Sequence, residues 1–303
     1  MNGENLTEKE HNVEEILVVG TIRNVEKSIT RDVSRLEASL GSLFKLSFFL
    51  VESDSSDNTI HQLQLLSNQL PDFRFLSLGN LEGEIPNRIE RIRFARNQYV
   101  NEIRSNSKYK HYNYIVVADL DGVNSQISEK SFLNAFRSEV PWDVITANQL
   151  GKYYDLLALR HPLWSPNNCF SSIEWLKPYI GTRRAWRNSI YQRMIRIPES
   201  SAPIEVHSAF GGLSVNRKWV FEKCDYKQRL GDPEDDNEHV TLNRQVRGFD
   251  GKVYIQPNFI NARWTTHSMH GIRLVHALKL VSDLPVFKVF KPFLRLLTKI
   301  IVK

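Results

Sequence analysis

The chain has 303 residues, of which 41% are hydrophobic and 24% are charged, a composition typical of a soluble globular protein with a substantial core. Its net charge of +6 favours an anionic partner, such as a nucleotide, a membrane surface or a nucleic acid. The two cysteines, Cys169 and Cys224, exclude a disulfide framework and a cysteine-based metal site and favour a reducing cytoplasm. There is no run of 18 apolar residues and no apolar N-terminal segment, so we expect neither a membrane span nor a secretory signal.

The first half of the chain alternates strand and helix patterns. We expect residues 1–14 to be disordered. Hydrophobic periodicity then predicts strands at 15–20, 44–51, 73–78 and 115–118, and helices within 25–43, at 60–70 and at 87–105. Such alternation is typical of a parallel sheet with right-handed crossovers. It predicts a nucleotide-binding half at residues 15–122.

The second half, residues 123–267, is less regular, and we expect it to hold the acceptor site. A helix is predicted at 129–138, and strands are predicted at 142–147, 204–215 and 252–256. Residues 153–198 are rich in Trp, Tyr, Pro and Asn and show little periodicity, which is typical of a functional loop. The tail, 268–303, is basic and apolar and predicts an amphipathic helix that binds an anionic membrane surface. Packing on the domain or a dimer contact is the alternative for this tail.

Two carboxylates follow the predicted strand at 115–118, at the point where it leaves the sheet. Asp119 and Asp121 are separated by Leu120 and followed by Gly122. Ligands of open α/β sheets bind at the carboxyl ends of the strands, where two acids can hold a divalent cation and, through it, a diphosphate. These oxygen ligands suit Mn²⁺ or Mg²⁺. The alternative is an Asp/Gly turn with solvated side chains.

Five motifs in a fixed order indicate a family. They are an acidic-serine turn at 52–59, an arginine-rich helix motif at 91–97, the Asp-x-Asp-Gly strand end at 119–122, a Phe-Gly-Gly segment at 209–212 and an acidic cluster at 235–240. Over roughly residues 15–267 the chain resembles GT-A glycosyltransferases, in particular bacterial and fungal enzymes related to the cryptococcal mannosyltransferase and procollagen galactosyltransferase groups. The resemblance implies an α/β, Rossmann-like fold with a mainly parallel central sheet flanked by helices.

The resemblance also implies roles for individual residues. The donor nucleotide-sugar would contact Thr21, Arg23, Glu52, Asp54, Arg91, Asn97, Asp119 and Leu120. The metal ligands would be Asp119, Asp121 and His267. The catalytic carboxylate would be Glu238 or Asp236, and the acceptor would contact Phe210, Gly211, Gly212 and Trp164. For Arg91 the alternative is a solvated basic helix face, and for the two glycines it is a bulge that the sheet requires.

The resemblance implies a metal-dependent glycosyltransferase that moves a sugar from a UDP- or GDP-type donor to a glycan or lipid-linked acceptor in bacterial surface polysaccharide synthesis. We expect a cytoplasmic enzyme, peripheral at the inner face of the cell membrane, without a nucleic-acid partner. One alternative is a haloacid-dehalogenase-like phosphatase with Asp119 as nucleophile, although that Asp-x-Asp normally opens its domain, whereas a three-strand unit precedes it here. The other alternative is a non-catalytic, membrane-anchored scaffold.

Overall fold

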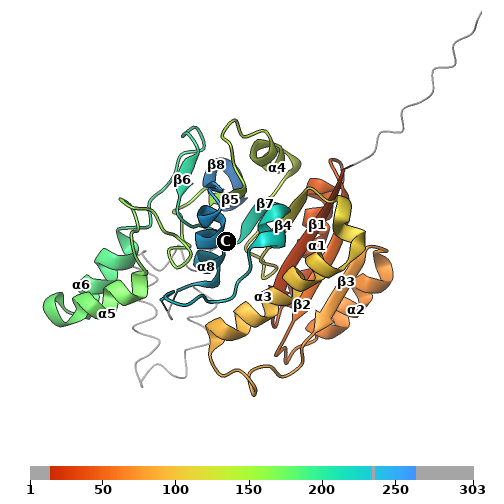
Figure 1. The fold of residues 1–303 in the computed structure, drawn as a ribbon, viewed down its shortest axis with the longest axis horizontal. Helices are drawn as coiled ribbons and strands as arrows, with labels where there is room; N and C mark the ends of the chain where they lie inside the picture. Colours follow the sequence, from red (N-terminus) through yellow and green to blue (C-terminus); the bar gives the residue numbers. More distant parts are fainter. Residues whose placement is uncertain (1–13, 234–235, 264–303) are drawn as a thin grey trace, which may run out of the picture.

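A computed structural model describes residues 14–233 and 236–263 of the chain (Figure 1). Three of the predictions fall outside these residues: the disordered N-terminus apart from Glu14, the metal ligand His267, and the amphipathic tail.

The first half of the chain follows the predicted alternation closely. Its elements are β1 (Glu15–Ile22), α1 (Ile29–Leu40), β2 (Lys45–Glu52), α2 (Thr59–Gln69), β3 (Phe73–Ser77), α3 (Arg88–Ser105), the short 3₁₀ helix η1 (Ser107–His111) and β4 (Tyr114–Ala118). Helix α3 begins where the sequence predicts, because the Asn87 side chain accepts hydrogen bonds from the backbone N–H groups of Ile89 and Glu90.

The second half departs from the prediction in several places. Its elements are α4 (Glu129–Phe136), β5 (Val144–Gln149), α5 (Cys169–Ile180), α6 (Thr182–Trp186), the π-helical turn η2 (Arg187–Tyr191), β6 (Ile204–Val206), β7 (Leu213–Arg217), α7 (Trp219–Lys223), α8 (Glu238–Gly248) and β8 (Val253–Ala262). Helices α7 and α8 were not predicted. The prediction of an irregular segment at 153–198 is wrong, because α5, α6 and η2 occupy its second half. Aromatic residues on the exposed face of α5 hide the helical periodicity there.

The predicted single strand at 204–215 is also wrong. Strand β6 ends at Val206 and β7 begins at Leu213; directly before β7, Gly211 and Gly212 have positive φ angles of 70° and 85°, which are not compatible with a continuous strand. The two strands are not neighbours in the sheet, since β7 lies between β4 and β5 whereas β6 forms an edge.

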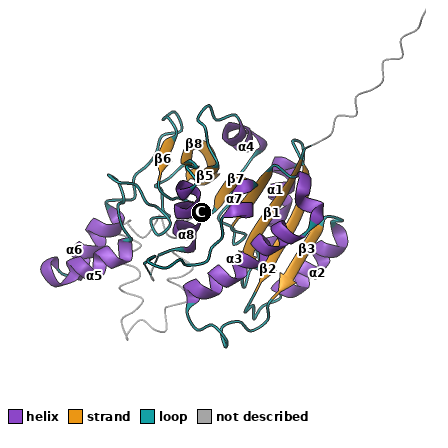
Figure 2. Cartoon of the chain, in the orientation of Figure 1, coloured by secondary structure: helices purple, strands orange, loops and turns teal. Residues whose placement is uncertain are grey.

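The described strands form one eight-stranded sheet in the order β3-β2-β1-β4-β7-β5-β8-β6 (Figure 2). The pairs β1–β2, β2–β3, β1–β4 and β5–β8 are parallel, whereas β7 runs antiparallel to both of its neighbours and β6 antiparallel to β8. Strand β4 of the first half therefore joins β7 of the second half in a continuous sheet. The fold-class prediction, an α/β protein with a mainly parallel central sheet, is confirmed.

Helices cover both faces of this sheet. Leu17 and Val19 of β1 face a hydrophobic cluster to which α3 and α8 contribute, and Ile16 and Val18 face a second cluster shared with α1, α2 and α4. This alternation along one strand is the two-residue period of β structure, with both faces buried. Within the described part of the chain, no helix has the length and apolarity needed to cross a bilayer.

Candidate functional site

Most of the predicted donor and metal residues surround a pocket at the carboxyl ends of β1, β2 and β4. Its volume is about 850 Å³, and its walls include Thr21 after β1, Asp54 after β2, and Asp119 and Asp121 after β4. Strand order reverses between β1 and β4, which is the position where open α/β sheets bind their ligands. We call this cavity the donor pocket, after the nucleotide-sugar donor that the sequence resemblance implies for these residues.

The loop after β4 is held so that its two carboxylates reach the donor pocket. The Asp119 N–H donates to the Gly212 carbonyl at 2.9 Å, and the Asn124 side chain donates to the Asp119 carbonyl at 2.7 Å. Gly122, at φ +94°, donates its N–H to the buried Asp32 carboxylate at 2.7 Å. The turn after the strand is therefore fixed by hydrogen bonds on both sides.

Negative charge accumulates around Asp119. Burial raises the pKa of Asp119 to about 7, Arg96 opposes this rise, and the carboxylates of Asp121, Asp155 and Glu238 add to it. A divalent cation bound by Asp119 and Asp121 would offset the negative charge at this position and displace the proton. The donor set therefore fits a hard metal ion.

Arg96 of α3 contacts two carboxylates that line the pocket, those of Glu238 and Asp119. Its Nε donates to Glu238 Oε1 at 3.1 Å, and its Nη2 lies 3.6 Å from Asp119 Oδ1. The guanidinium also lies over the rings of Phe210 and Tyr226, at 5.4 and 5.6 Å from their centroids. Arg96 was not among the predicted site residues, although its place in the 91–97 motif was a signal that could have identified it.

Glu238 is the first residue of α8 and lines the donor pocket. The Asn237 side chain caps this helix by accepting from the His239 N–H at 2.9 Å. The His239 ring stacks on Phe210, with centroids 3.8 Å apart, and burial followed by the charge of Arg96 holds the pKa of His239 well below its usual value. Glu238 is thus positioned by a capped helix end, a stacked neighbour and Arg96.

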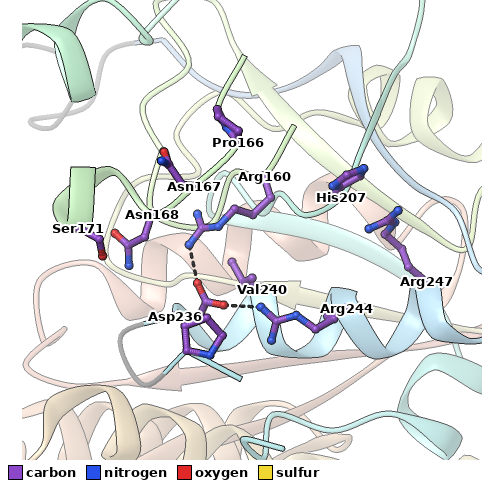
Figure 3. A pocket seen from close by; sticks show the side chains of 11 residues that line it. Arg160, Pro166, Asn167, Asn168, Ser171, His207, Asp236, Val240, Arg244 and Arg247 are labelled. Atoms are coloured by element: carbon purple, nitrogen blue, oxygen red, sulfur yellow. Dashed lines mark hydrogen bonds and ion pairs between the residues drawn. The ribbon is translucent and has the colours of Figure 1, made fainter. Parts of the chain in front are cut away.

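Asp236 lies outside the donor pocket, in a second cavity of about 450 Å³ (Figure 3). Its carboxylate accepts from Arg160 at 2.7 Å and pairs with Arg244, and Figure 3 shows Asp236 between these two arginines. Glu238 and Asp236 therefore line different cavities. Of the two predicted catalytic acids, only Glu238 lines the donor pocket.

The remaining predicted donor residues divide into two groups. Those that line the donor pocket are Thr21, Arg23, Asp54, Arg91, Asp119 and Leu120. Glu52 and Asn97 support the structure instead. The Glu52 carboxylate accepts from the Ser55 N–H at 2.9 Å, and Asn97 accepts from the Tyr226 N–H at 3.0 Å.

Arg91 and Arg88 differ in their partners. The Arg91 guanidinium donates to the carbonyls of Ile85 and Pro86, at 2.9 and 2.8 Å, and to Glu82 at 3.2 Å, so it fixes the loop before α3. Arg88 also lines the pocket, is exposed, and forms no ion pair with any residue of the described ranges. Arg88 is therefore the better placed of the two to bind a diphosphate.

The predicted acceptor residues have mixed positions. Phe210 lines the donor pocket. A Cβ atom on Gly211 would lie 2.9 Å from the Ala147 carbonyl, and one on Gly212 would lie 2.9 Å from the Tyr154 hydroxyl, so both glycines allow close packing at the sheet end. Trp164 donates its Nε1–H to the Arg193 carbonyl at 2.6 Å and lines neither cavity.

Of the three predicted metal ligands, Asp119 and Asp121 lie within the described residues. Over residues 14–233 and 236–263, no group of three or more His, Cys, Asp or Glu side chains is arranged to hold a metal ion. Asp119 and Asp121 would therefore share the ion with oxygen atoms of the substrate and water, as Mg²⁺ sites on diphosphates commonly do.

Comparisons with known proteins find similarity only in structure. No family model matches the chain, and no curated protein matches it in sequence. Residues 1–349 of S. aureus TarS share 13% identity with this chain, at a TM-score of 0.42 over 88% of this chain. The chain spans 64% of that structure's length. The mannosyltransferase PcManGT of Pyrobaculum calidifontis, in complex with GDP-Man and Mn²⁺, shares 15% identity with a TM-score of 0.48, over 94% of this chain and 69% of its own. Glucosyl-3-phosphoglycerate synthase of Mycobacterium tuberculosis, with Mn²⁺, UDP and phosphoglyceric acid, shares 12% identity with a TM-score of 0.38, over 82% and 67%.

Proposed function

We propose that this chain is a metal-dependent glycosyltransferase that uses a nucleotide-sugar donor. The observation that carries the proposal is the donor pocket itself, where Asp119, Asp121, Arg96 and Glu238 meet at the reversal of strand order. Two cation-binding carboxylates, basic side chains and a further carboxylate in one cavity suit a diphosphate leaving group and a hydroxyl nucleophile.

The proposed donor contacts follow from the walls of the pocket. Thr21, Arg23 and Asp54 would contact the nucleoside, and Arg88 would bind the diphosphate through its planar guanidinium. Asp119 and Asp121 would hold Mn²⁺ or Mg²⁺. When bound, this ion would supply Lewis-acid stabilisation of the departing nucleoside diphosphate.

Glu238 is proposed as the catalytic carboxylate. It lines the donor pocket, is 4% exposed, and is held by Arg96 at 3.1 Å. A carboxylate in this position can accept the proton of an acceptor hydroxyl or stabilise the positive charge that develops at the sugar carbon. Asp236 cannot do so from its position, because its carboxylate is paired with Arg160 and Arg244 in the other cavity.

We propose a glycan or lipid-linked saccharide acceptor, bacterial surface polysaccharide as the product, and a cytoplasmic protein at the inner face of the membrane. The resemblance of the five motifs and the basic tail support these proposals. The phosphatase alternative requires a late acid beside Asp119, whereas Asp232 pairs with Arg244 at 2.5 Å and does not line the donor pocket.

A binding experiment tests the proposal directly. The melting temperature of the full chain would be measured with UDP-, GDP-, CMP- and dTDP-sugars, each with and without Mn²⁺. We expect a rise with one nucleotide class that requires Mn²⁺ and disappears in Asp121→Asn, because that substitution removes one carboxylate ligand. Asp250→Asn is the matched control. Asp250 is exposed at φ +59°, a conformation that asparagine tolerates, and it does not line the pocket.

Other outcomes of these experiments would contradict the proposed function. No shift with any donor, or a shift that survives in Asp121→Asn, would contradict the proposal and favour a non-catalytic scaffold. Release of inorganic phosphate from a phosphoester, abolished in Asp119→Asn, would favour the phosphatase.

A further inference from the structure

Residues 169–191, which comprise α5, α6 and η2, form a projection at one edge of the molecule (Figure 1). We call them the helical projection. Four of its aromatic side chains are exposed: Phe170, Trp175, Tyr179 and Trp186. Trp175 and Tyr179, which are 68% and 73% exposed, are four residues apart on α5 and therefore lie on one face, with ring centroids 5.3 Å apart.

The helical projection is also strongly basic. It contains Lys177, Arg183, Arg184 and Arg187, all exposed, against the single acid Glu174, so three positive charges are uncompensated. Glu174 lies 3.7 Å from Lys177, and the three arginines form no ion pair with any described residue. Exposed Trp and Tyr beside Arg and Lys are typical of protein surfaces that lie in the interface of an anionic bilayer.

The opposite side of the helical projection is part of the protein core. Ile173, Ala185 and Ile190 are buried in the hydrophobic cluster beneath the sheet. Phe170 and Trp186 meet edge to face at 6.0 Å and line the donor pocket. The helical projection is therefore anchored to the core. The same projection contributes Phe170 and Trp186 to the wall of the donor pocket and exposes Trp175 and Tyr179 to solvent.

We propose that the helical projection is a membrane-docking surface, with Trp175 and Tyr179 inserting between lipid headgroups and Arg183, Arg184 and Arg187 binding anionic lipids. Trp175 and Tyr179 pack against each other at an interplanar angle of 45°. Two tilted, highly exposed rings on one helix face suit insertion into lipid better than the flat, open stacking of a sugar ring.

The consequence of docking for catalysis rests on the proposed glycosyltransferase function. Because Phe170 and Trp186 of the same segment line the donor pocket, docking would hold that pocket beside the bilayer. A membrane-borne acceptor, such as a lipid-linked saccharide, would then reach Glu238 without leaving the membrane. The docking surface (169–191) and the basic tail (268–303) are different segments of the sequence, so substitutions can test each by itself.

Vesicle co-sedimentation of the full chain tests the proposal, with phosphatidylcholine vesicles and with mixed phosphatidylcholine and phosphatidylglycerol vesicles. We expect binding to the mixed vesicles to fall about tenfold or more in Trp175→Ser/Tyr179→Ser, because two apolar anchors are lost. Phe94→Ser, which removes a 43% exposed aromatic on α3 outside the helical projection, is the control and should bind like the wild type.

Charge is tested with a second matched pair. Arg183→Gln/Arg184→Gln should weaken binding to the mixed vesicles roughly 30-fold, at about a fivefold loss for each basic residue near an anionic surface. Lys130→Gln/Arg137→Gln removes two exposed cations of the α4 region and should have a much smaller effect. Unchanged binding in the aromatic or the arginine variant, or equal binding to both kinds of vesicle, would overturn the proposal.

Two further measurements separate this proposal from its alternatives. The nucleotide-dependent melting shift, measured without vesicles, should be the same in Trp175→Ser/Tyr179→Ser and in the wild type. If the shift is missing in both proteins, the result contradicts the proposed glycosyltransferase function but leaves the proposed docking surface intact. Binding of the wild type to a soluble anionic polysaccharide such as alginate, without binding to vesicles, would overturn membrane docking in favour of a glycan surface.

Discussion

Replacement of Arg96 by glutamine tests how the donor pocket is held together. Arg96 and Glu238 each have side chains that are 5% exposed, and their charged atoms are 3.1 Å apart. Removing one partner of such a pair leaves the other as a buried charge without compensation, at a cost of about 3–5 kcal/mol. We therefore expect Arg96→Gln to reduce the free energy of unfolding by this amount.

A control for this variant exists on the protein surface. Arg74 also forms an ion pair, with Glu102 at 2.6 Å, and also lies over an aromatic ring, Phe49. Its side chain is 49% exposed, so solvent screens the pair and Arg74→Gln should cost about 1 kcal/mol or less. Urea denaturation of both variants would give the two values.

A double variant identifies the cause of the loss. In Arg96→Gln/Glu238→Gln no buried charge is left unpaired at this contact, so the free energy lost should be smaller than the sum of the two single losses. A cost below about 1 kcal/mol for Arg96→Gln, or strict additivity in the double variant, would refute the reasoning.

Three further predictions concern the surroundings of this pair. Gly212→Ala should cost about 1–3 kcal/mol and weaken the metal-dependent nucleotide shift, because its φ of +85° is strained for alanine and the new methyl group would meet the Tyr154 hydroxyl; unchanged stability would contradict this. His239 is buried and neutral, so acidification from pH 6.5 downwards protonates the unfolded chain first and lowers stability, by up to about 1.4 kcal/mol per pH unit. His239→Gln should lose this contribution, and identical pH profiles of unfolding for variant and wild type would exclude it. Asp236→Asn should destabilise the fold by about 3–5 kcal/mol, because it leaves a buried arginine unpaired, while the nucleotide shift is retained; loss of the shift in the folded variant would show that Asp236 serves the donor pocket.

Much of the parallel half could be predicted from the sequence. The apolar runs of β1, β2 and β4 are buried on both faces. The apolar residues of α1 recur at helical spacing and form the side of the helix that packs on the sheet. Local patterns therefore specify these elements. The position of Asp119 and Asp121 at a strand end followed in the same way, since the end of an apolar run and the glycine after it are both visible in the sequence.

The second half could not be predicted as well, because its local signals were ambiguous. The run at 204–215 looks like one strand, but residues 207–212, which include the left-handed Gly211 and Gly212, divide it. In α5, exposed Trp175 and Tyr179 occupy positions where a helix usually carries polar residues, so the hydrophobic period was lost.

The sequence by itself determined which segments become strands and helices of the first half, and it placed two acids and a glycine at the end of a buried strand. Only the tertiary structure decided which charges meet there. Arg96 and Glu238 are 142 residues apart in the chain, and their contact depends on the insertion of β7 beside β4 and on the packing of α8 under the sheet. The same packing directs Glu238 into the donor pocket and Asp236 into the other cavity, although the two acids are neighbours in one motif. Local periodicity reflects residues within a few turns of each other, whereas a buried ion pair forms between whichever side chains the completed fold brings together.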